Sequence, residues 1–301
     1  GGTAPRLNSK NGFARGFDSY FQVNKNYFLN RPKINSIING IDSYKGFDKF
    51  FFLHLDCLHE PSISFLDDQK PLAHDIDFLD KDNPKFNVDA YIKGLEEIDN
   101  ELGYLIDYLN CKSEMDKTLI LLTGDHGNGL NWKKGAEYSL YDERVRVPLV
   151  VKYPEWVTDK KTDLNKPVSS VFEIHKIIKS ALKIEVSEEF MNLPQYSKDY
   201  VDYVFSEVIM MPNKDRNRQS LSIIYNDFKY VCFNEIDWKK FKVKNRLSDR
   251  LYKKDITSGF FNEKIDISEN NQVDFINLRN IGYKVIDANL NFHKKYPADR
   301  Y

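Results

Sequence analysis

The sequence is short of cysteine, of long apolar runs and of any charge imbalance, and each shortage excludes a class of protein. Its three cysteines, Cys57, Cys111 and Cys232, are widely spaced, which excludes a disulfide framework and a cysteine-based metal site. No apolar run reaches the roughly 18 residues that a membrane helix needs. The 44 basic residues balance 45 acidic ones, so the chain lacks the basic field that nucleic acids attract. We therefore expect no nucleic-acid partner and no membrane span.

The first residues do not show the charged-then-apolar pattern of a secretory leader, so the sequence assigns no compartment. What the chain does have is the composition of a globular protein. Its 301 residues are 41% hydrophobic, which supports a real core. This length allows one large α/β domain or two modest ones.

The most informative stretch is residues 117–127, a continuous apolar segment that ends in Gly-Asp-His-Gly. Such a run predicts a strand buried on both faces of an α/β sheet. The glycines allow a sharp turn, which places Asp125 and His126 just past the strand's carboxyl end, where open α/β sheets bind ligands. A carboxylate beside an imidazole is a suitable pair of ligands for a divalent metal. The alternative is a tight turn with an N-capping Asp125 and a surface His126.

Hydrophobic periodicity predicts several further elements before residue 184. Apolar residues at three- and four-residue steps predict a helix over 88–109, with Asn87 as its candidate cap. Short apolar runs predict strands over 50–55 and 148–154. A second apolar stripe predicts a helix over 168–183, opened by a proline in its first turn.

The texture of the sequence changes from about residue 185. Alternating segments predict three strands of an antiparallel meander, over 203–209, 220–225 and 229–233. Residues 226–228 form the predicted turn between the last two strands. The polar stretch at the C-terminus predicts a helix followed by a tail.

Three motifs occur in a fixed order along the chain. Residues 51–61 read strand-His-x-x-x-x-His-x-Pro, residues 117–127 read strand-Gly-Asp-His-Gly, and residues 138–151 contain Leu-Tyr-Asp-Glu-x-x-Arg-Val-Pro-Leu. In this order they resemble the sulfatase family of the alkaline-phosphatase-like superfamily. Residues 4–18 resemble the segment that precedes the first motif in these enzymes, and the resemblance is firm to about residue 156.

The resemblance implies a fold class and a domain organisation. We expect an α/β domain over residues 1–184, with an alkaline-phosphatase-like mixed sheet that is flanked by helices and lacks its N-terminal strands. A small α+β subdomain, with antiparallel strands and a polar tail, is expected over residues 185–301. The chain should therefore be the later part of a sulfatase-like protein, and a missing N-terminal segment is a candidate partner.

The resemblance also implies roles for individual residues. Asp125 and His126 match positions that bind a divalent metal in sulfatases, usually calcium. His59 matches a position that contacts the sulfate or the leaving group, and its imidazole is the candidate general acid. Many sulfatases have a lysine that contacts the sulfate at the position of Glu137. Because a carboxylate there would repel an anion, Lys134 of the same loop is the candidate substrate contact. The alternatives are a His59 held by its Pro turn and a solvated Lys134.

Two features of the family are absent from this sequence. No pair of aspartates precedes residue 18 to complete the metal site. The Cys/Ser-x-Pro-x-Arg motif, whose first residue becomes the formylglycine nucleophile of sulfatases, is not found, because none of the three cysteines has a proline two residues later. We therefore expect the chain to be catalytically silent on its own.

Three functions stay open on the sequence. The resemblance implies metal-dependent hydrolysis of a sulfate ester. A histidine at position 126, and Glu137 in place of the lysine that contacts the sulfate, suit instead a phosphodiester or phosphonate hydrolase, or a phosphoethanolamine transferase, of the same superfamily. The third is a catalytically inactive fragment or a binding domain. In the first two, the substrate is an anionic sulfate or phosphate ester.

Overall fold

The computed structural model describes the chain in segments, and the chain forms two compact units. The described residues are 14–20, 30–55, 84–127, 140–158, 173–183, 199, 202–209, 217–258, 260–263 and 265–295. One unit consists of Gly1–Thr118 with Leu130–Trp132, and the other of Leu119–Gly129 with Lys133–Tyr301. The domain boundary predicted at residue 184 stays a prediction.

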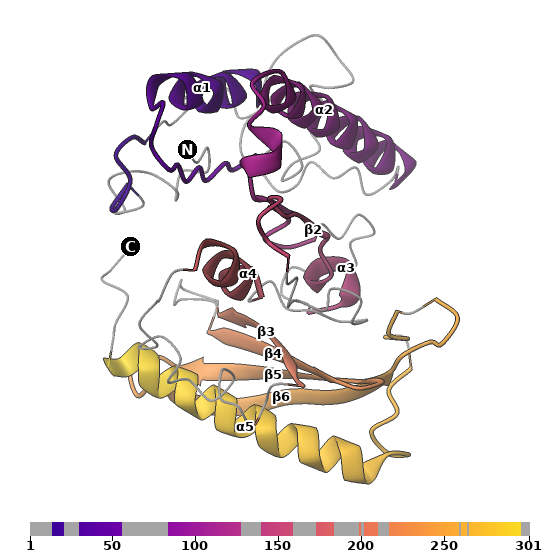
Figure 1. The fold of residues 1–301 in the computed structure, drawn as a ribbon. Helices are drawn as coiled ribbons and strands as arrows, with labels where there is room; N and C mark the ends of the chain where they lie inside the picture. Colours follow the sequence, from indigo (N-terminus) through magenta and orange to yellow (C-terminus); the bar gives the residue numbers. More distant parts are fainter. Residues whose placement is uncertain are drawn as a thin grey trace. The chain divides into compact units, whose positions relative to one another are not determined.

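The first unit is built on helices (Figure 1). Its described elements are α1 (Asn30–Ser43), α2 (Pro84–Cys111) and the 3-10 helix η4 (Met115–Lys117). α2 packs against α1 and confirms the helix predicted over 88–109. It begins at Pro84, which suits a first turn because proline has no N–H to donate. Asn87 therefore lies inside the helix, so its prediction as the cap is wrong.

The core of the first unit is small. Among its described residues, the buried apolar side chains are Ile34, Ile38 and Leu109. The apolar stripe predicted for α2 is only partly covered, since Leu95 is 43% exposed. Across the described part of both units, no helix combines the length and the apolar character that a bilayer crossing requires.

Residues 50–55 of the first unit do not form the strand that the sequence predicts. No described strand pairs with them, and Phe50 and Phe52 are 59% and 55% exposed. An apolar alternating segment becomes a strand only when a neighbour takes up its backbone hydrogen bonds, and none of the described strands does so.

The second unit begins with a two-stranded ribbon. β1 (Ile120–Thr123) and β2 (Leu149–Lys152) pair antiparallel, with Ile120 opposite Lys152 and Thr123 opposite Leu149. Both predicted strands are confirmed, but the burial predicted for them is wrong. Leu122 is 38% exposed and Val150 is 56% exposed, because no further described strand pairs with this ribbon to bury it as a central strand is buried.

Two helices flank β2 in the sequence. α3 (Asp142–Val145) precedes it, and α4 (Glu173–Leu182) follows it. α4 confirms the helix predicted over 168–183 in its described part, and residues 168–172 lie outside the described residues. The indole Nε1 of Trp156 donates to the carbonyl of Ala181 at 3.4 Å, which fastens α4 to the segment after β2.

A four-stranded antiparallel sheet forms the larger part of the second unit. Its strands are β3 (Val204–Ile209), β4 (Arg218–Tyr225), β5 (Phe228–Asp237) and β6 (Lys242–Lys253), in the order β3-β4-β5-β6. The predicted meander is confirmed, while β6 was not predicted as a strand. Tyr225 pairs with Phe228, so the loop between β4 and β5 has two residues, and Asn226 adopts φ +52° there. Asparagine tolerates this left-handed conformation better than most residues.

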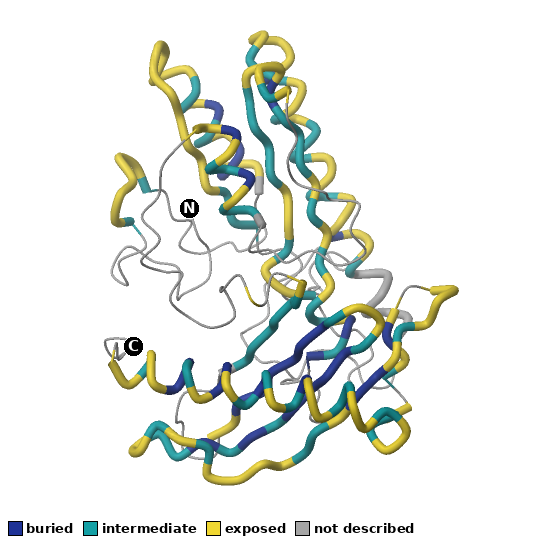
Figure 2. The backbone as a smooth tube through the Cα atoms, turned by 60° about the horizontal axis from the view of Figure 1, so that its bottom comes forward, coloured by how far each residue is buried: buried dark blue, intermediate teal, exposed yellow. Residues whose placement is uncertain are grey.

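Both faces of the four-stranded sheet are covered. The predicted C-terminal helix is α5 (Gln272–Lys295), which lies across one face and packs Val285, Ile286 and Leu290 against Ile223 and Tyr230 (Figure 1). The neighbouring residues of the strands point the other way, as the pleat requires. They are Ile224, Val231 and Tyr252, which pack with Leu140 and Phe261. Figure 2 shows the resulting concentration of buried residues along the central strands.

Candidate metal-binding corner

The corner, Gly124–Gly127, follows β1 directly. Oδ1 of Asp125 accepts a hydrogen bond from the backbone N–H of His126 at 2.8 Å. Nδ1 of the His126 ring lies 2.9 Å from the carbonyl oxygen of Gly127. Because a carbonyl oxygen only accepts, this hydrogen bond requires the ring proton on Nδ1. In the neutral ring the lone pair then lies on Nε2, the nitrogen that a metal would bind.

The two side chains of the corner fit a cation. Nε2 of His126 lies 3.7 Å from Oδ2 of Asp125, and in the neutral ring both atoms offer a lone pair. Two ligand atoms of one divalent cation lie roughly 3 to 4 Å apart at ordinary coordination distances. The side chain of Asp125 is 72% exposed and that of His126 is 49% exposed, so an ion and its waters can reach them from solvent. Within the described ranges, no group of three or more His, Cys, Asp or Glu side chains gathers as a complete metal site.

The corner is docked on α3 through Gly127. The backbone N–H of Gly127 donates to the carbonyl of Arg144 at 2.6 Å. A Cβ at this position would lie 2.1 Å from the carbonyl oxygen of Glu143. Only glycine allows the two backbones to come this close. The last glycine of the Gly-Asp-His-Gly motif therefore serves a close approach between the corner and α3.

The start of α3 is held by an ionic network. Lys229, on β5, places Nζ 2.8 Å from Oδ1 of Asp142 and also donates to Oε1 of Glu263. Oδ2 of Asp142 accepts from the backbone N–H of Phe261 at 3.0 Å. The backbone N–H of Asp142 donates to both carboxylate oxygens of Glu263 at 3.1 Å. The backbone N–H and both carboxylate oxygens of Asp142 are thereby bonded to the sheet or to the loop after it.

This network is withdrawn from solvent. The side chain of Lys229 is 0% exposed, and those of Asp142 and Glu263 are 10% and 15% exposed. Burial raises the pKa of the Glu263 carboxyl, and the neighbouring Lys229 ammonium partly offsets this rise. One cation between two carboxylates is the arrangement that makes buried charges tolerable.

The structure describes only part of the predicted site. Asp125 and His126, which are neighbours in the sequence, lie together at the corner, and their role as metal ligands stays a prediction. The predicted acid His59 and the predicted substrate contact Lys134 lie outside the described residues, so their roles stay predictions.

The sequence reading missed the network around Asp142, although two signals point to it. Asp142 lies inside the third motif. Lys229 shares its face of β5 with the core residue Val231, and a lysine at a core position of a strand indicates a buried acidic partner.

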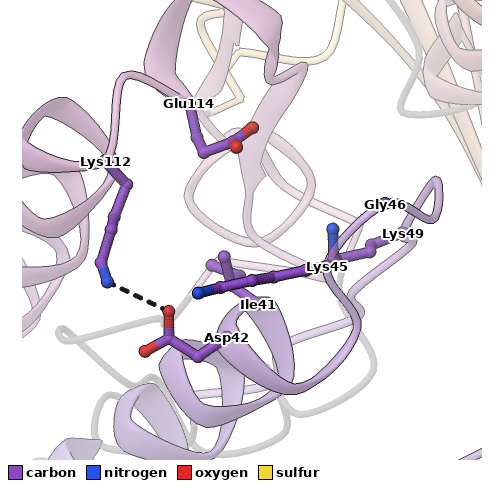
Figure 3. A pocket seen from close by; sticks show the side chains of 7 residues that line it. All are labelled: Ile41, Asp42, Lys45, Gly46, Lys49, Lys112 and Glu114. Atoms are coloured by element: carbon purple, nitrogen blue, oxygen red, sulfur yellow. Dashed lines mark hydrogen bonds and ion pairs between the residues drawn. The ribbon is translucent and has the colours of Figure 1, made fainter.

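The first unit contains a hollow of about 310 Å³. Its lining residues are Ile41, Asp42, Lys45, Gly46, Lys49, Lys112 and Glu114 (Figure 3). Two of its ammonium groups are engaged within the protein, since Lys112 Nζ lies 3.1 Å from Asp42 Oδ1 and Lys49 Nζ donates to the carbonyl of Phe47 at 2.9 Å. The hollow shares no residue with the corner, and its mixed charges select neither an anion nor a cation.

The chain resembles known sulfatases in sequence. The choline-sulfatase of Rhizobium meliloti is 32% identical over 126 residues, which is 38% of this chain and 24% of that protein. The N-acetylglucosamine-6-O-sulfatase of Bacteroides thetaiotaomicron is 26% identical over 167 residues, which is 51% of this chain and 29% of that protein. The matched part thus spans only about a quarter of the length of each of these relatives.

A solved structure resembles the chain in fold. It is a Bacteroides thetaiotaomicron protein from work on the metabolism of multiple glycosaminoglycans, with a TM-score of 0.53 and 14% identity over 91% of this chain and 62% of that one. This likeness confirms the predicted α/β fold of the alkaline-phosphatase-like type. The sulfatase family model matches residues 7–182, which include all three ordered motifs. The match covers more than half of the sequence, and the chain therefore belongs to the sulfatase family.

Proposed function

We propose that the chain takes part in the hydrolysis of a sulfate ester, with Asp125 and His126 as two ligands of a divalent cation. Calcium is the proposed cation, because it is the usual metal of the family. One observation carries this proposal. In a chain of the sulfatase family, the acceptor atoms Oδ2 of Asp125 and Nε2 of His126 lie 3.7 Å apart at the end of β1. The bound cation would supply positive charge that holds the ester oxygens and polarises the sulfur.

The chain's own residues prepare the corner for this task. The hydrogen bond from Nδ1 of His126 to the carbonyl of Gly127 fixes the ring orientation and keeps the lone pair on Nε2. The tie from Gly127 to Arg144 fixes the backbone that carries both side chains. His59 is the proposed donor of the proton to the leaving alcohol, and Lys134 the proposed contact to the anionic ester.

The formylglycine of sulfatases does not fit this sequence. None of the three cysteines begins the Cys-x-Pro-x-Arg motif, so no residue of the chain is assigned as the nucleophile and no covalent step is derived. We expect no turnover of an aryl sulfate by the 301-residue chain alone. Turnover of that substrate would show that another residue of the chain acts as the nucleophile.

Calcium titration of the chain by isothermal calorimetry tests the proposal. A site with few protein ligands should bind with a dissociation constant of roughly 10⁻⁴ to 10⁻³ M. Asp125→Asn removes one charged ligand and should weaken binding by about tenfold or more. Asp227→Asn is the matched control, because Asp227 is an exposed carboxylate in the hairpin turn between β4 and β5, and it should leave the affinity unchanged. Equal binding by the chain and by Asp125→Asn would refute the assignment.

A phosphodiester hydrolase is the second candidate, because the corner offers the imidazole nitrogen of His126 as a ligand. Imidazole favours zinc and similar metals, whereas carboxylate oxygens favour calcium and magnesium. Parallel titrations with Ca²⁺ and Zn²⁺ therefore separate the candidates. A preference for Zn²⁺ that His126→Asn abolishes would favour the phosphoryl reaction over sulfate ester hydrolysis.

A further inference from the structure

The corner is connected to the sheet through a chain of contacts in the second unit. Its first link is the hydrogen bond from Gly127 N–H to the carbonyl of Arg144, at 2.6 Å. Its second link is α3 itself, which contains Arg144 and begins at Asp142. Its third link joins Asp142 to Lys229 on β5, at 2.8 Å. Asp142 and Lys229 are separated by 87 positions in the sequence, so this link depends on the tertiary fold.

α3 has little stability of its own. It has four residues, and Tyr141 at its N-cap provides no side-chain hydrogen bond to the first turn. A single helical turn costs more conformational entropy than its hydrogen bonds return. The missing cap is supplied from elsewhere, because the Asp142 N–H donates to both oxygens of Glu263. The position of α3 is therefore set by groups outside it.

We propose that Lys229 is a positioning residue for the corner. Its buried ammonium draws Asp142 and Glu263 together, and this sets where α3 begins. The place of α3 sets the carbonyl of Arg144, which orients Gly127 and with it the ligand pair Asp125 and His126. The inference rests on the proposed function, since Lys229 would position the two proposed ligands without contacting the cation itself.

Lys229→Met removes the ammonium and keeps most of the side-chain volume. The two carboxylates then repel each other in a buried site, so α3 should move or fray. We expect the calcium dissociation constant to rise by about tenfold, the lower end of what the loss of an outer support costs a metal site. The matched control is Lys244→Met, which breaks the exposed ion pair with Glu235 on the same sheet and should leave the affinity unchanged.

Hydrogen exchange supplies a readout that does not depend on the cation. In Lys229→Met, the amide of Gly127 should exchange about tenfold faster or more, because its partner carbonyl has moved. The amides of Val285 and Ile286 in α5 should keep their rates. Uniformly faster exchange through the whole second unit would show a merely structural role and would overturn the proposal. Unchanged exchange at Gly127 would overturn it as well.

Two further arms keep the test decisive. If Lys229→Met does not fold, Lys229→Met with Glu263→Gln removes one of the two opposed charges, and the same criteria apply to that double variant. If the unmodified chain binds no calcium, the proposed function fails, and the exchange of Gly127 alone decides the positioning role. Weakened calcium binding together with faster exchange confined to the corner and α3 supports both.

Discussion

The corner and the four-stranded sheet are held in very different ways. The corner extends from a ribbon of two strands, and its two proposed metal ligands are exposed. The side chain of Asp125 is 72% exposed and that of His126 is 49% exposed. The sheet buries Tyr230 and Ile236 completely and is covered on both faces. The two proposed metal ligands thus lie where little local packing holds them. Their geometry depends on connections to the well-packed sheet.

The largest difference between the two regions should appear in stability. Ile286→Ala opens a cavity between α5 and the sheet at a position with 0% exposure, and it should cost about 2 to 5 kcal/mol of the free energy of unfolding. Leu122→Ala in β1 is the matched change at a side chain that is 38% exposed, and it should cost about 1 kcal/mol or less. Urea unfolding followed by circular dichroism measures both. Equal costs would mean that β1 is as buried as the sequence predicts.

A smaller and more local effect is expected at the junction of the corner and α3. Gly127→Ala forces a methyl group against the Glu143 carbonyl, so the hydrogen bond to Arg144 should break and calcium binding should weaken by about tenfold. Calcium titration by calorimetry measures this change.

Gly103→Ala in α2 is the control for that substitution, because a Cβ there meets nothing within 4 Å. It should leave the calcium affinity unchanged and raise stability by roughly 0.5 to 1 kcal/mol through better helix propensity. If both alanine variants bind calcium like the unmodified chain, the contact between Gly127 and α3 does not shape the corner.

The elements that the sequence predicts well are those with a local signal. The helix α2 and the first three strands of the meander each carry their own periodicity, and the polar C-terminal stretch indicates α5. β6 was missed because it is an edge strand in which half of the residues are charged and more than half are exposed, and such strands lack the alternating apolar pattern. Residues 50–55 carry a strand-like pattern without a described pairing partner, and a pattern cannot supply that partner.

The candidate site likewise has a part that a local motif predicts and a part that it does not. Asp125 and His126 are adjacent in a motif, so the sequence alone brings them together. The network around Asp142 joins residues 87 and 121 positions away, and no local pattern predicts such pairings. The support of the corner is therefore the part of the site that required the structure.

The smallest predicted effect concerns pH and separates the covered face of the sheet from its rim. Glu207 lies under α5, where its carboxylate accepts from Gln219 and from Asn289, the latter at 2.6 Å. Burial raises the pKa of Glu207, and these two hydrogen bonds only partly offset the rise. Glu235 lies near the end of β5, which is the rim of the sheet in the strand direction, and hydrogen bonds from Lys244 and Asn245 lower its pKa.

The two shifts predict opposite slopes of stability against pH. Folded Glu207 holds its proton to a higher pH than the unfolded chain does, so its contribution is complete below the unfolded pKa of about 4.5 and is lost as pH rises through the folded value. Glu235 contributes stability above the unfolded pKa, and this is lost as pH falls through its lowered folded value.

These contributions can be measured by urea unfolding of the chain, Glu207→Gln and Glu235→Gln from pH 3 to about pH 8. The difference between the chain and each variant isolates the contribution of that one glutamate, because the similar contribution of Glu263 cancels. The advantage of the chain over Glu207→Gln should shrink as pH rises, and its advantage over Glu235→Gln should grow. Slopes of the same sign would mean that α5 does not shield Glu207 from solvent, and the contrast between face and rim would fail.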